Sequence, residues 1–400
     1  MPIKNGAIEV AITGAGICTP GRGKLRPIMD VMLDAVDSAL ADAGLTLEDI
    51  DGLATFPSTY NLGAGAKGDA PIDVIGLKEA LGIDVTHFSG GVEGPAQYTS
   101  IFDAIGAIMS GQARHVLCYR TLAQYTQQVQ ARAKPQKDSH GYDRVSGKWM
   151  YHRPFNVTSP VASTAMMFRR HAHEFGTTKE QLGHLVVNTR KNAQKNPHAV
   201  YRDPMTMDDY MNARMICEPL GLYDCDAMLD ASTVIIVSRL DAARNMRKTP
   251  LVIESFSGRM GGRYSWDQFE PKWGMMALEN GPHLWRQTDL KPGDVRVANL
   301  YDGFSPQALV WLEALGFCGL GESGPFVDGA HRIALDGELP LNTGGGQLSG
   351  GRLHGLGLLW ETCIQMWGEG GERQVPGDVN VGVAAAGGGP LACSILLRRD

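Results

Sequence analysis

The stretch N-T-G-G-G-Q-L-S-G-G-R-L-H-G-L-G spans residues 342–357 and interrupts the chain between two apolar segments. Glycine makes up 50 of the 400 residues, well above the usual ~7%. Further glycine clusters stand at 90–94, 258–263 and 385–390. Glycine clusters between apolar runs indicate tight turns, or backbone that approaches a ligand closely. Residues 343–351 are therefore predicted to be a glycine loop that leads into a long helix, expected at about 354–370.

Outward from this loop, apolar runs of strand length alternate with segments of helical periodicity. Strands are expected at 8–17, 115–118, 232–238, 250–255, 295–300, 379–385 and 392–397. Helices are expected at 26–43, 96–110, 160–175, 178–195, 267–278, 305–315 and 354–370. This alternation predicts an α/β fold whose sheet is covered on both faces.

The rhythm of the first part repeats after residue 248, which suggests an internal duplication. The predicted halves are residues 1–248 and 249–400, with an insertion at about 120–155 in the first half. Within it, residues 129–154 have mixed charge and few large apolar side chains. They are interpreted as a surface insertion or lid, or else as a plain solvated loop.

Composition excludes several classes of protein. Hydrophobic residues at 43% and a net charge of −6 are typical of a globular protein and argue against nucleic-acid binding. No apolar run reaches the ~18 residues of a membrane span, and the N-terminus lacks a signal-peptide pattern. The seven cysteines are scattered and form no C-x-x-C pair. We therefore expect a cytoplasmic protein with reduced thiols and no metal site.

The end of the chain resembles the thiolase superfamily, most closely its sterol-carrier and lipid-transfer branch. The resemblance rests on the 342–357 stretch, on G-E-G-G-E-R-Q-V-P-G (368–377) and on V-A-A-A-G-G-G-P-L-A-C-S-I-L-L (383–397). It extends to the segments 108–117, 174–182, 214–232 and 300–305. This resemblance implies the duplicated five-layer αβαβα thiolase-like fold, a homodimer, and loops that accept an acyl-CoA thioester.

The sequence departs from the thiolase pattern at the positions that carry thiolase chemistry. The nucleophilic cysteine would fall near Gly94, yet no cysteine lies between Cys18 and Cys118. The histidine of the G-H-P motif is Arg352, and the second cysteine is replaced by Ala385 or Ala386. The asparagine or histidine of the N-E-A-F or H-D-C-F motif is Tyr301, in L-Y-D-G-F. Reactions through a thioester-linked enzyme are excluded, because they need the activated thiolate.

Glycine loops without a nucleophile still suit one kind of reaction on a CoA thioester. Backbone N–H groups around Gly345, Gly346, Gly388 and Gly389 could stabilise an enolate, although such clusters can also be packing turns. A retro-aldol cleavage of a β-hydroxyacyl-CoA needs this oxyanion hole together with a base and an acid.

Tyr301 and His354 are the predicted catalytic residues of this cleavage. A phenol needs a polarising neighbour to act as a base, and His354, in R-L-H-G, is the predicted partner. Arg352 could favour the phenolate or hold a thioester oxygen. Asp302 is expected to orient a loop or pair with Arg352, and Tyr264 is a third candidate from G-G-R-Y-S-W. Alternatively, Tyr301 and Tyr264 are core side chains, and His354 faces solvent or CoA.

The pattern of losses is similar to that of the non-thiolytic steroid side-chain aldolases of the lipid-transfer branch. That resemblance implies a lyase that cleaves a 17-hydroxy steroid acyl-CoA to a 17-keto steroid and a short acyl-CoA such as propionyl-CoA. It implies a small OB-fold/zinc-ribbon partner, a homodimer core in a heterotetramer, and no cofactor, because CoA is part of the substrate. The W-G-M-M-A-L segment (273–278) could line a sterol pocket or form a buried core helix.

Two alternatives stay open on the sequence. One is a non-catalytic protein of thiolase fold that binds lipids or sterol-CoA esters, or serves as a scaffold. The other is a different non-covalent reaction of a CoA ester, such as hydrolysis or a decarboxylative step.

Overall fold

A computed structural model describes residues 9–21, 23–57, 68–91, 94–133, 149–155, 157, 159–260, 276–389 and 391–400. Its main sheet has nine strands in the order β3-β2-β4-β7-β1-β8-β11-β10-β9. The strands of the first part are β1 (Val10–Cys18), β2 (Gly52–Thr55), β3 (His87–Gly90), β4 (His115–Ala123) and β7 (Asp230–Arg239). Those of the second part are β8 (Leu251–Met260), β9 (Val297–Asn299), β10 (Val381–Gly387) and β11 (Leu391–Arg399). A small separate sheet pairs β5 (Met215–Cys217) with β6 (Leu220–Gly221).

The sheet consists of two groups of strands with the same order and directions. In the first group, β2 is parallel to β4, and the pairs β4–β7 and β7–β1 are antiparallel. In the second group, β9 is parallel to β10, and the pairs β10–β11 and β11–β8 are antiparallel. An isolated parallel bridge between Ala298 and Leu341 occupies the place that β3 has in the first group. The groups meet where Ala11 and Ile12 of β1 pair with Val252 and Leu251 of β8.

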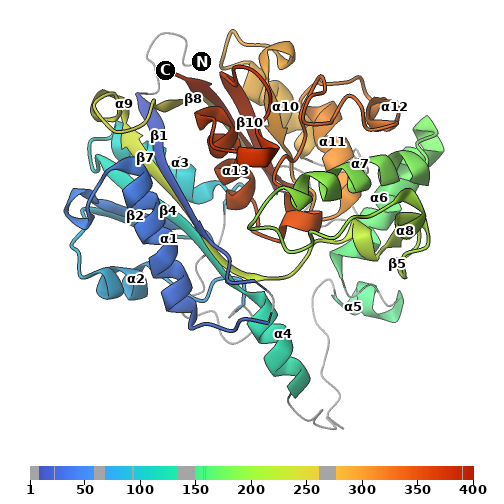
Figure 1. Ribbon diagram of the computed structural model, residues 1–400, viewed down its shortest axis with the longest axis horizontal. Coiled ribbons are helices and arrows are strands. Elements are labelled where there is room, and N and C mark those ends of the chain that lie inside the picture. The colour runs from blue at the N-terminus through green and yellow to red at the C-terminus, as the bar shows by residue number, and fades with distance from the viewer. Residues whose placement is uncertain are drawn as a thin grey trace.

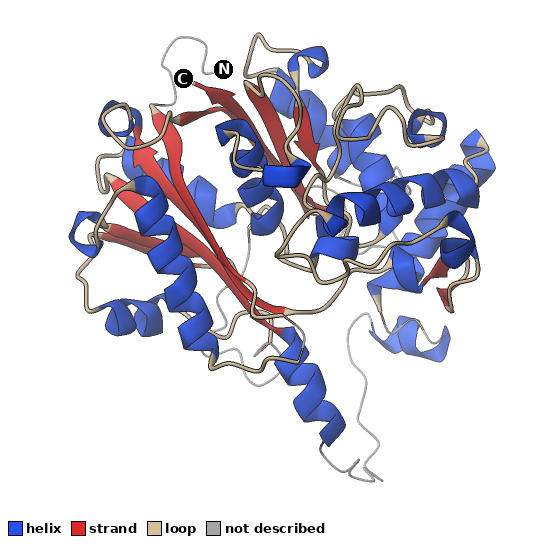
Figure 2. Cartoon of the chain, in the orientation of Figure 1, coloured by secondary structure: helices blue, strands red, loops and turns tan. Residues whose placement is uncertain are grey.

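Helices lie outside and between the two groups of strands, which gives the layers of the αβαβα fold (Figure 2). On the outer face of the first group lies α1 (Ile28–Ala43), which contacts β1, β7 and β4. On the outer side of the second group, α10 (Ala277–Trp285) contacts β8 and β11 and packs on α11 (Ser305–Ala314). The expected duplicated thiolase-like fold is therefore confirmed.

The central layer contains α3 (Thr99–Met109) and α13 (Leu356–Trp367). Strands of both groups contact α13, namely β10 and β9 on one side and β7 and β1 on the other. Every residue of α13 from Leu356 to Met366 is buried, as expected for a helix covered on all sides. The glycine loop immediately before α13 is thereby fixed at the centre of the molecule.

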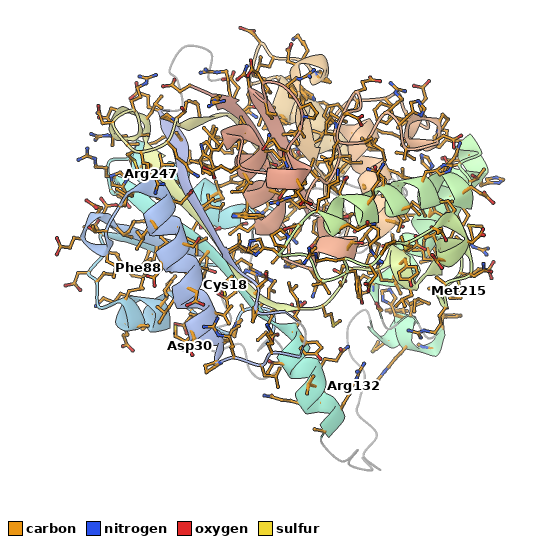
Figure 3. The ribbon with its side chains drawn as sticks, in the orientation of Figure 1. Cys18, Asp30, Phe88, Arg132, Met215 and Arg247 are labelled. Atoms are coloured by element: carbon orange, nitrogen blue, oxygen red, sulfur yellow. The ribbon has the colours of Figure 1, made fainter. Side chains whose placement is uncertain are left out.

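The remaining helices lie around this core. They are α2 (Val74–Leu81), α4 (Gln124–Ala133), α5 (Trp149–His152), α6 (Pro160–Phe175), α7 (Lys179–Gln194), α8 (Met207–Met211), α9 (Leu240–Ala243) and α12 (Ser323–Val327). Figure 3 shows side chains filling the interior, with Phe88 and Met215 on opposite sides of the molecule. Both side chains are exposed. Within the described ranges, no helix is both long and apolar enough to cross a membrane.

One sequence prediction differs from the structure. The strand expected at 115–118 continues through Ala123, so residues 120–123 belong to the sheet rather than to the insertion. From its end, α4 projects away from the body of the molecule (Figure 1), and residues 134–148 lie outside the described residues. Of the helix expected at 267–278, residues 267–275 also lie outside the described residues, and α10 begins at Ala277.

The position of Met276 and Ala277 also bears on the W-G-M-M-A-L segment. Both residues are fully buried in the main hydrophobic core. The described part of this segment therefore packs in the core rather than lining a pocket.

Candidate functional site

The glycine loop at 343–351 is held in place by the side chain of Asn342. Asn342 Oδ1 accepts a hydrogen bond from the Leu300 backbone N–H (2.7 Å), and its Nδ2 donates to the Leu300 carbonyl (3.0 Å). Gly345 and Gly346 then have φ values of 95° and 53°, a region that glycine adopts without steric cost. The turn continues as a short π-helical segment, Gly346–Gly350 (η6). The loop therefore faces the end of β9, where Tyr301 and Asp302 follow.

Asp302 lies directly beneath this loop. Its Oδ1 accepts a hydrogen bond from the Gln347 backbone N–H at 2.8 Å. A methyl group on Gly346 would lie 2.0 Å from Asp302 Oδ2, so only glycine fits there. Burial raises the pKa of Asp302 to about 7, although hydrogen bonds from Gln347, Leu348 and Asn342 lower it. Asp302 is in position to orient the glycine loop.

Tyr301 is buried, and its ring lies next to the imidazole of His354. The two ring centroids are 6.4 Å apart. Burial raises the pKa of Tyr301 to about 12, Asp226 and Asp302 raise it further, and Arg352 and Gln347 lower it. The phenol is therefore protonated at neutral pH, and a positive charge beside it favours the ionised form.

Arg352 is held by two carboxylates, neither of which belongs to Asp302. Its Nε lies 2.9 Å from Asp226 Oδ2, and its Nη1 lies 3.3 Å from Asp69 Oδ1. The expected pairing of Asp302 with Arg352 was wrong, because Asp302 points into the glycine loop while Arg352 points to the 226 segment. Burial raises the pKa of Asp226 to about 6, although Arg352 lowers it. At neutral pH, Arg352 and Asp226 form an ion pair beside Tyr301.

His354, like Arg352, contacts residues of the first half at this site. It has a φ of 57°, which is unusual for a residue other than glycine. Its backbone N–H donates to Gln347 Oε1 (3.1 Å), its Nδ1 lies 2.7 Å from Arg120 Nη2, and its Nε2 lies 3.2 Å from the Gln97 carboxamide. Burial lowers the pKa of His354 well below its usual value, and Arg120 and Arg352 lower it further. The imidazole is therefore neutral.

Arg120 reaches His354 from the end of β4. Its side chain is almost fully buried. Its Nη1 donates to the Phe56 carbonyl at 2.6 Å. Burial lowers the pKa of Arg120 to about 10, although Asp69 and Tyr301 raise it, so the guanidinium is still charged at neutral pH. This places a buried cation directly against the imidazole.

In the glycine cluster at 385–390, Gly388 and Gly389 accept hydrogen bonds through their carbonyl oxygens. Gly388 accepts from Gln307 Nε2 (2.9 Å), and Gly389 accepts from the Met276 backbone N–H (3.3 Å). A methyl group on Gly388 would lie 2.6 Å from Gln307 Nε2. These contacts fix the direction of the peptide groups, on which any donor role of their N–H groups depends.

Of the predicted residues, the structure brings together Tyr301, His354, Arg352 and Asp302 around the 343–351 loop. Tyr264 lies outside the described residues. A pocket beside the loop is lined by Gly346, Gln347 and Gly351 together with residues such as Asn196 and His198. Neither Tyr301 nor His354 lines that pocket, and Gln347 belongs to both the pocket and the cluster.

Several polar residues of the site were not predicted from the sequence, among them Gln97, Arg120, Asp226 and Gln347. Each of these four had a weak signal. Gln97 ends the G-G-V-E-G-P-A-Q loop, Asp226 stands in D-C-D, and Gln347 interrupts the glycines. Arg120 is a charged residue at the end of an apolar strand, which is the pattern of a polar group aimed into a site.

The cysteines do not provide a nucleophile. Cys118, Cys363 and Cys393 are buried, and burial raises the pKa of each thiol above its ordinary value. A thiol of this kind is inert rather than activated. Within the described part of the chain, no group of three or more His, Cys, Asp or Glu side chains has metal-binding geometry.

Residues 271–397 match the family described as thiolase C-terminal domain-like. The chain is 35% identical to the 17-hydroxy-3-oxo-4-pregnene-20-carboxyl-CoA lyase of Mycobacterium tuberculosis, over 97% of this chain and 99% of that protein. It is 32% identical to the steroid side-chain-cleaving aldolase of Thermomonospora curvata, over 98% of both chains.

Solved structures agree with these sequence relatives. The Ltp2–ChsH2(DUF35) aldolase superposes with a TM-score of 0.82 at 31% identity, covering 99% of this chain and 98% of that one. Human mitochondrial 3-ketoacyl-CoA thiolase superposes with a TM-score of 0.66 at 15% identity, over 98% of both chains, which shows the shared fold alone. This chain therefore belongs to the thiolase superfamily, in the branch that contains the steroid side-chain-cleaving aldolases.

Proposed function

We propose that this protein is a carbon–carbon lyase that cleaves a 17-hydroxy steroid acyl-CoA by a retro-aldol reaction. The products are a 17-keto steroid and a short acyl-CoA such as propionyl-CoA. The observation that carries the proposal is the convergence of Tyr301, His354 and Arg352 at the glycine loop, on a thiolase fold whose nucleophile is absent.

The reaction moves one proton and breaks one bond. A base accepts the proton of the C17 hydroxyl, and the oxygen electrons form the new ketone. The bond between C17 and the α-carbon of the thioester breaks, and its electron pair passes to the thioester oxygen as an enolate. The α-carbon of the enolate then accepts a proton, which releases the short acyl-CoA. The enzyme must therefore handle a proton at C17, a proton at the α-carbon and a negative charge on the thioester oxygen.

The residues of the site match these three tasks. Tyr301 is a phenol beside a cation, suited to proton exchange. His354 offers an imidazole whose ring centroid lies 6.4 Å from that of the phenol. In the glycine loop, the Gly345 N–H already donates to the Asn342 carbonyl (2.9 Å), so the Gly346 N–H is the loop donor that we propose for the thioester oxygen. Both the lyase from M. tuberculosis and the aldolase from T. curvata, which are similar over nearly the whole chain, are named for this kind of cleavage.

The proposal includes a partner and an assembly. The solved Ltp2–ChsH2(DUF35) aldolase contains a second component. We infer that this chain also works with a small OB-fold/zinc-ribbon protein, as a homodimer core in a heterotetramer in the cytoplasm. The reaction as written needs no cofactor besides the CoA of the substrate.

The test is to incubate the purified chain, with and without the candidate partner, with a 17-hydroxy steroid acyl-CoA that carries a short side chain. Formation of the 17-ketone and of propionyl-CoA in equal amounts is the expected result. A saturated side-chain analogue without the 17-hydroxyl is the matched control, and it must remain intact. Tight binding of the steroid-CoA without any turnover would contradict the proposal and favour a lipid-binding role.

A further inference from the structure

The contacts of His354 determine which of its nitrogens carries a proton. Arg120 Nη2 lies 2.7 Å from Nδ1. A guanidinium can only donate hydrogen bonds, so Nδ1 must be the acceptor and carries no hydrogen. A neutral imidazole has one N–H, which must then be on Nε2.

The third contact determines the orientation of Gln97. His354 Nε2 lies 3.2 Å from the carboxamide nitrogen, Nε2, of Gln97. Two N–H groups cannot bond to each other, so an Nε2–H tautomer requires the Gln97 carboxamide to be turned by 180°, with its oxygen toward the ring. The Gln97 Oε1 atom is buried and has no hydrogen-bond partner among the described residues where it now lies, which favours this turn. With the carboxamide turned, Nε2–H donates to Gln97 in the resting protein, and this edge of the ring is the one that a ligand oxygen can share.

The surroundings of His354 oppose a second proton on the ring. Arg120 reaches it from β4 and Arg352 lies in the same loop, and both carry positive charge. The acidic groups in the region, Asp69 and Asp226, are paired with Arg352 rather than with the imidazole. Tyr301, on the other side, is a neutral phenol. The hydrogen-bond acceptors of Arg120 among the described residues are the Phe56 carbonyl and His354, so no carboxylate stands between its charge and the imidazole, although Asp69 interacts with it electrostatically.

We propose that Arg120 is a positioning residue that holds His354 as a neutral Nε2–H tautomer, so that His354 donates a hydrogen bond to the thioester oxygen while Tyr301 exchanges the protons. The proposal rests on the proposed lyase function and assigns different roles in it to His354 and Tyr301. With Nδ1 bound to a guanidinium, the ring cannot accept a proton there. It could lose its Nε2 proton only as an imidazolate, so it neither takes the C17 hydroxyl proton nor supplies the α-carbon proton.

These roles account for each proton and for the electron pair in the cleavage. The Tyr301 phenol first releases its proton to solvent, a step that Arg352 favours, and the phenolate oxygen then accepts the C17 hydroxyl proton. The electron pair of the broken bond forms the enolate, whose oxygen accepts the hydrogen bond from His354 Nε2–H. The Tyr301 hydroxyl then returns its proton to the α-carbon, which regenerates the phenolate for the next turnover.

The first test uses the resting protein and needs no substrate. Histidine labelled with ¹⁵N is measured between pH 5 and 8, and the His354 signals are assigned by their loss in His354→Gln. The expected result is a protonated Nε2 and an unprotonated Nδ1 that do not change across this range. In Arg120→Met, the pKa of His354 should rise because one of the two cations is gone, although burial and Arg352 still lower it, and in Arg120→Lys the imidazole should stay neutral.

Arg114→Met is the matched control, because Arg114 is an exposed arginine just before the same strand. It should leave the His354 signals unchanged. A proton on Nδ1, or titration of His354 between pH 5 and 8 in the unaltered protein, overturns the proposal. If Arg120→Met does not fold, the Arg120→Lys spectrum and the unaltered spectrum still decide the tautomer.

The second test concerns catalysis. His354→Ala removes the donor and should lower kcat/KM by ~10²–10³, as for other oxyanion donors. His354→Gln places an N–H near the position of Nε2 and should recover most of this loss, to within ~10-fold of the unaltered rate. If His354→Gln is as slow as His354→Ala, proton exchange by the imidazole is indicated and the proposal is wrong. Absence of cleavage with a correct tautomer would instead count against the lyase function alone.

Discussion

The two arginines of the site have opposite electrostatic surroundings. On the Arg120 side, formed by Arg120, Gln97 and His354, the hydrogen-bond partners of the cation are a carbonyl and a neutral imidazole. On the Arg352 side, formed by Arg352, Asp226, Asp69 and Asp302, the cation is paired with carboxylates.

The pKa values follow this difference. Burial lowers the pKa of Arg120 to about 10. Burial also disfavours the charge of Arg352, but Asp226 and Asp69 outweigh it, so the pKa of Arg352 is raised. Arg120, which is not paired with a carboxylate, opposes protonation of His354. Arg352, whose charge is partly neutralised by carboxylates, lowers the pKa of Tyr301 only in part. Similar side chains thus give two different functions at one site.

The largest expected effect is at Tyr301, which lies between the two sides. Tyr301→Phe removes only the hydroxyl and should lower kcat by ~10²–10⁴ if the phenol exchanges the protons. The measurement is single-turnover formation of the 17-ketone, with circular dichroism to verify the fold. An unchanged rate would assign proton exchange to another group. The role proposed for Arg352, which is to favour ionisation of Tyr301, would then be wrong as well.

The next effect tests the loop that Asp302 holds on the Arg352 side. Gly346→Ala places a methyl 2.0 Å from Asp302 Oδ2 at a φ of +53°. The loop must shift, and a displacement of about 1 Å should reduce kcat/KM by ~10².

Gly82→Ala is the matched control, because Gly82 also has a positive φ (+66°) but nothing within 4 Å of the added methyl. It should cost some stability and leave the kinetic constants of the folded protein unchanged. Equal activity of the two variants would show that the position of the glycine loop is unimportant.

A smaller effect concerns stability on the Arg352 side. The pKa of Asp302 is raised by burial to about 7, from an ordinary value of 3.8. Between those values the folded state binds a proton that the unfolded state has released, so the free energy of unfolding falls as pH rises. The steepest slope is ~1.4 kcal/mol per pH unit. Asp302→Asn cannot titrate, so its stability should fall less than that of the unaltered protein between pH 5 and 7.5.

Urea unfolding at several pH values measures this difference. Between pH 5 and 7.5, the free energy of unfolding of Asp302→Asn should rise by ~2 kcal/mol relative to that of the unaltered protein. Parallel pH profiles for the two proteins would mean that Asp302 stays ionised at pH 5.

The smallest expected effect comes from removing one of the carboxylates that are paired with Arg352. Asp226→Asn removes a carboxylate that lies 2.9 Å from Arg352 Nε and should reduce kcat/KM by ~10-fold at pH 7.5, since one charge-assisted hydrogen bond is lost. The pKa of Asp226 is raised by burial to about 6, so the unaltered protein should lose the same contribution as pH falls through 6. The two pH–rate profiles should therefore converge in acid.

Asp69→Asn provides the comparison, because the Asp69 side chain is 45% exposed. Exposed ion pairs contribute little, so its effect should be under ~5-fold. A larger effect of Asp69→Asn than of Asp226→Asn would show that Asp69, and not Asp226, is the main partner of the Arg352 charge.

Much of the fold was predictable from the sequence, because local patterns determine it. The periodicity at 26–43 predicted α1, which ends where Gly44 adopts a φ of 70°. The alternation of strands and helices predicted the α/β class, and the motifs of the last sixty residues predicted the thiolase fold. The strand at 115–118 was predicted too short, and in the structure it continues through Ala123. The sheet there includes Arg120, a buried residue whose charge has hydrogen-bond acceptors at both terminal nitrogens.

The sequence by itself determined that Tyr301, Arg352 and His354 stand beside a glycine loop and that no thiolase nucleophile is present, because motif spacing and residue identity are local properties. The tertiary structure decided which charges meet. It placed Arg120 on His354 across 234 positions of the chain and paired Arg352 with Asp226 and Asp69 instead of Asp302. Ion pairs and tautomers depend on distances of a few ångströms between distant segments, and only the packing of the two halves around α13 sets those distances.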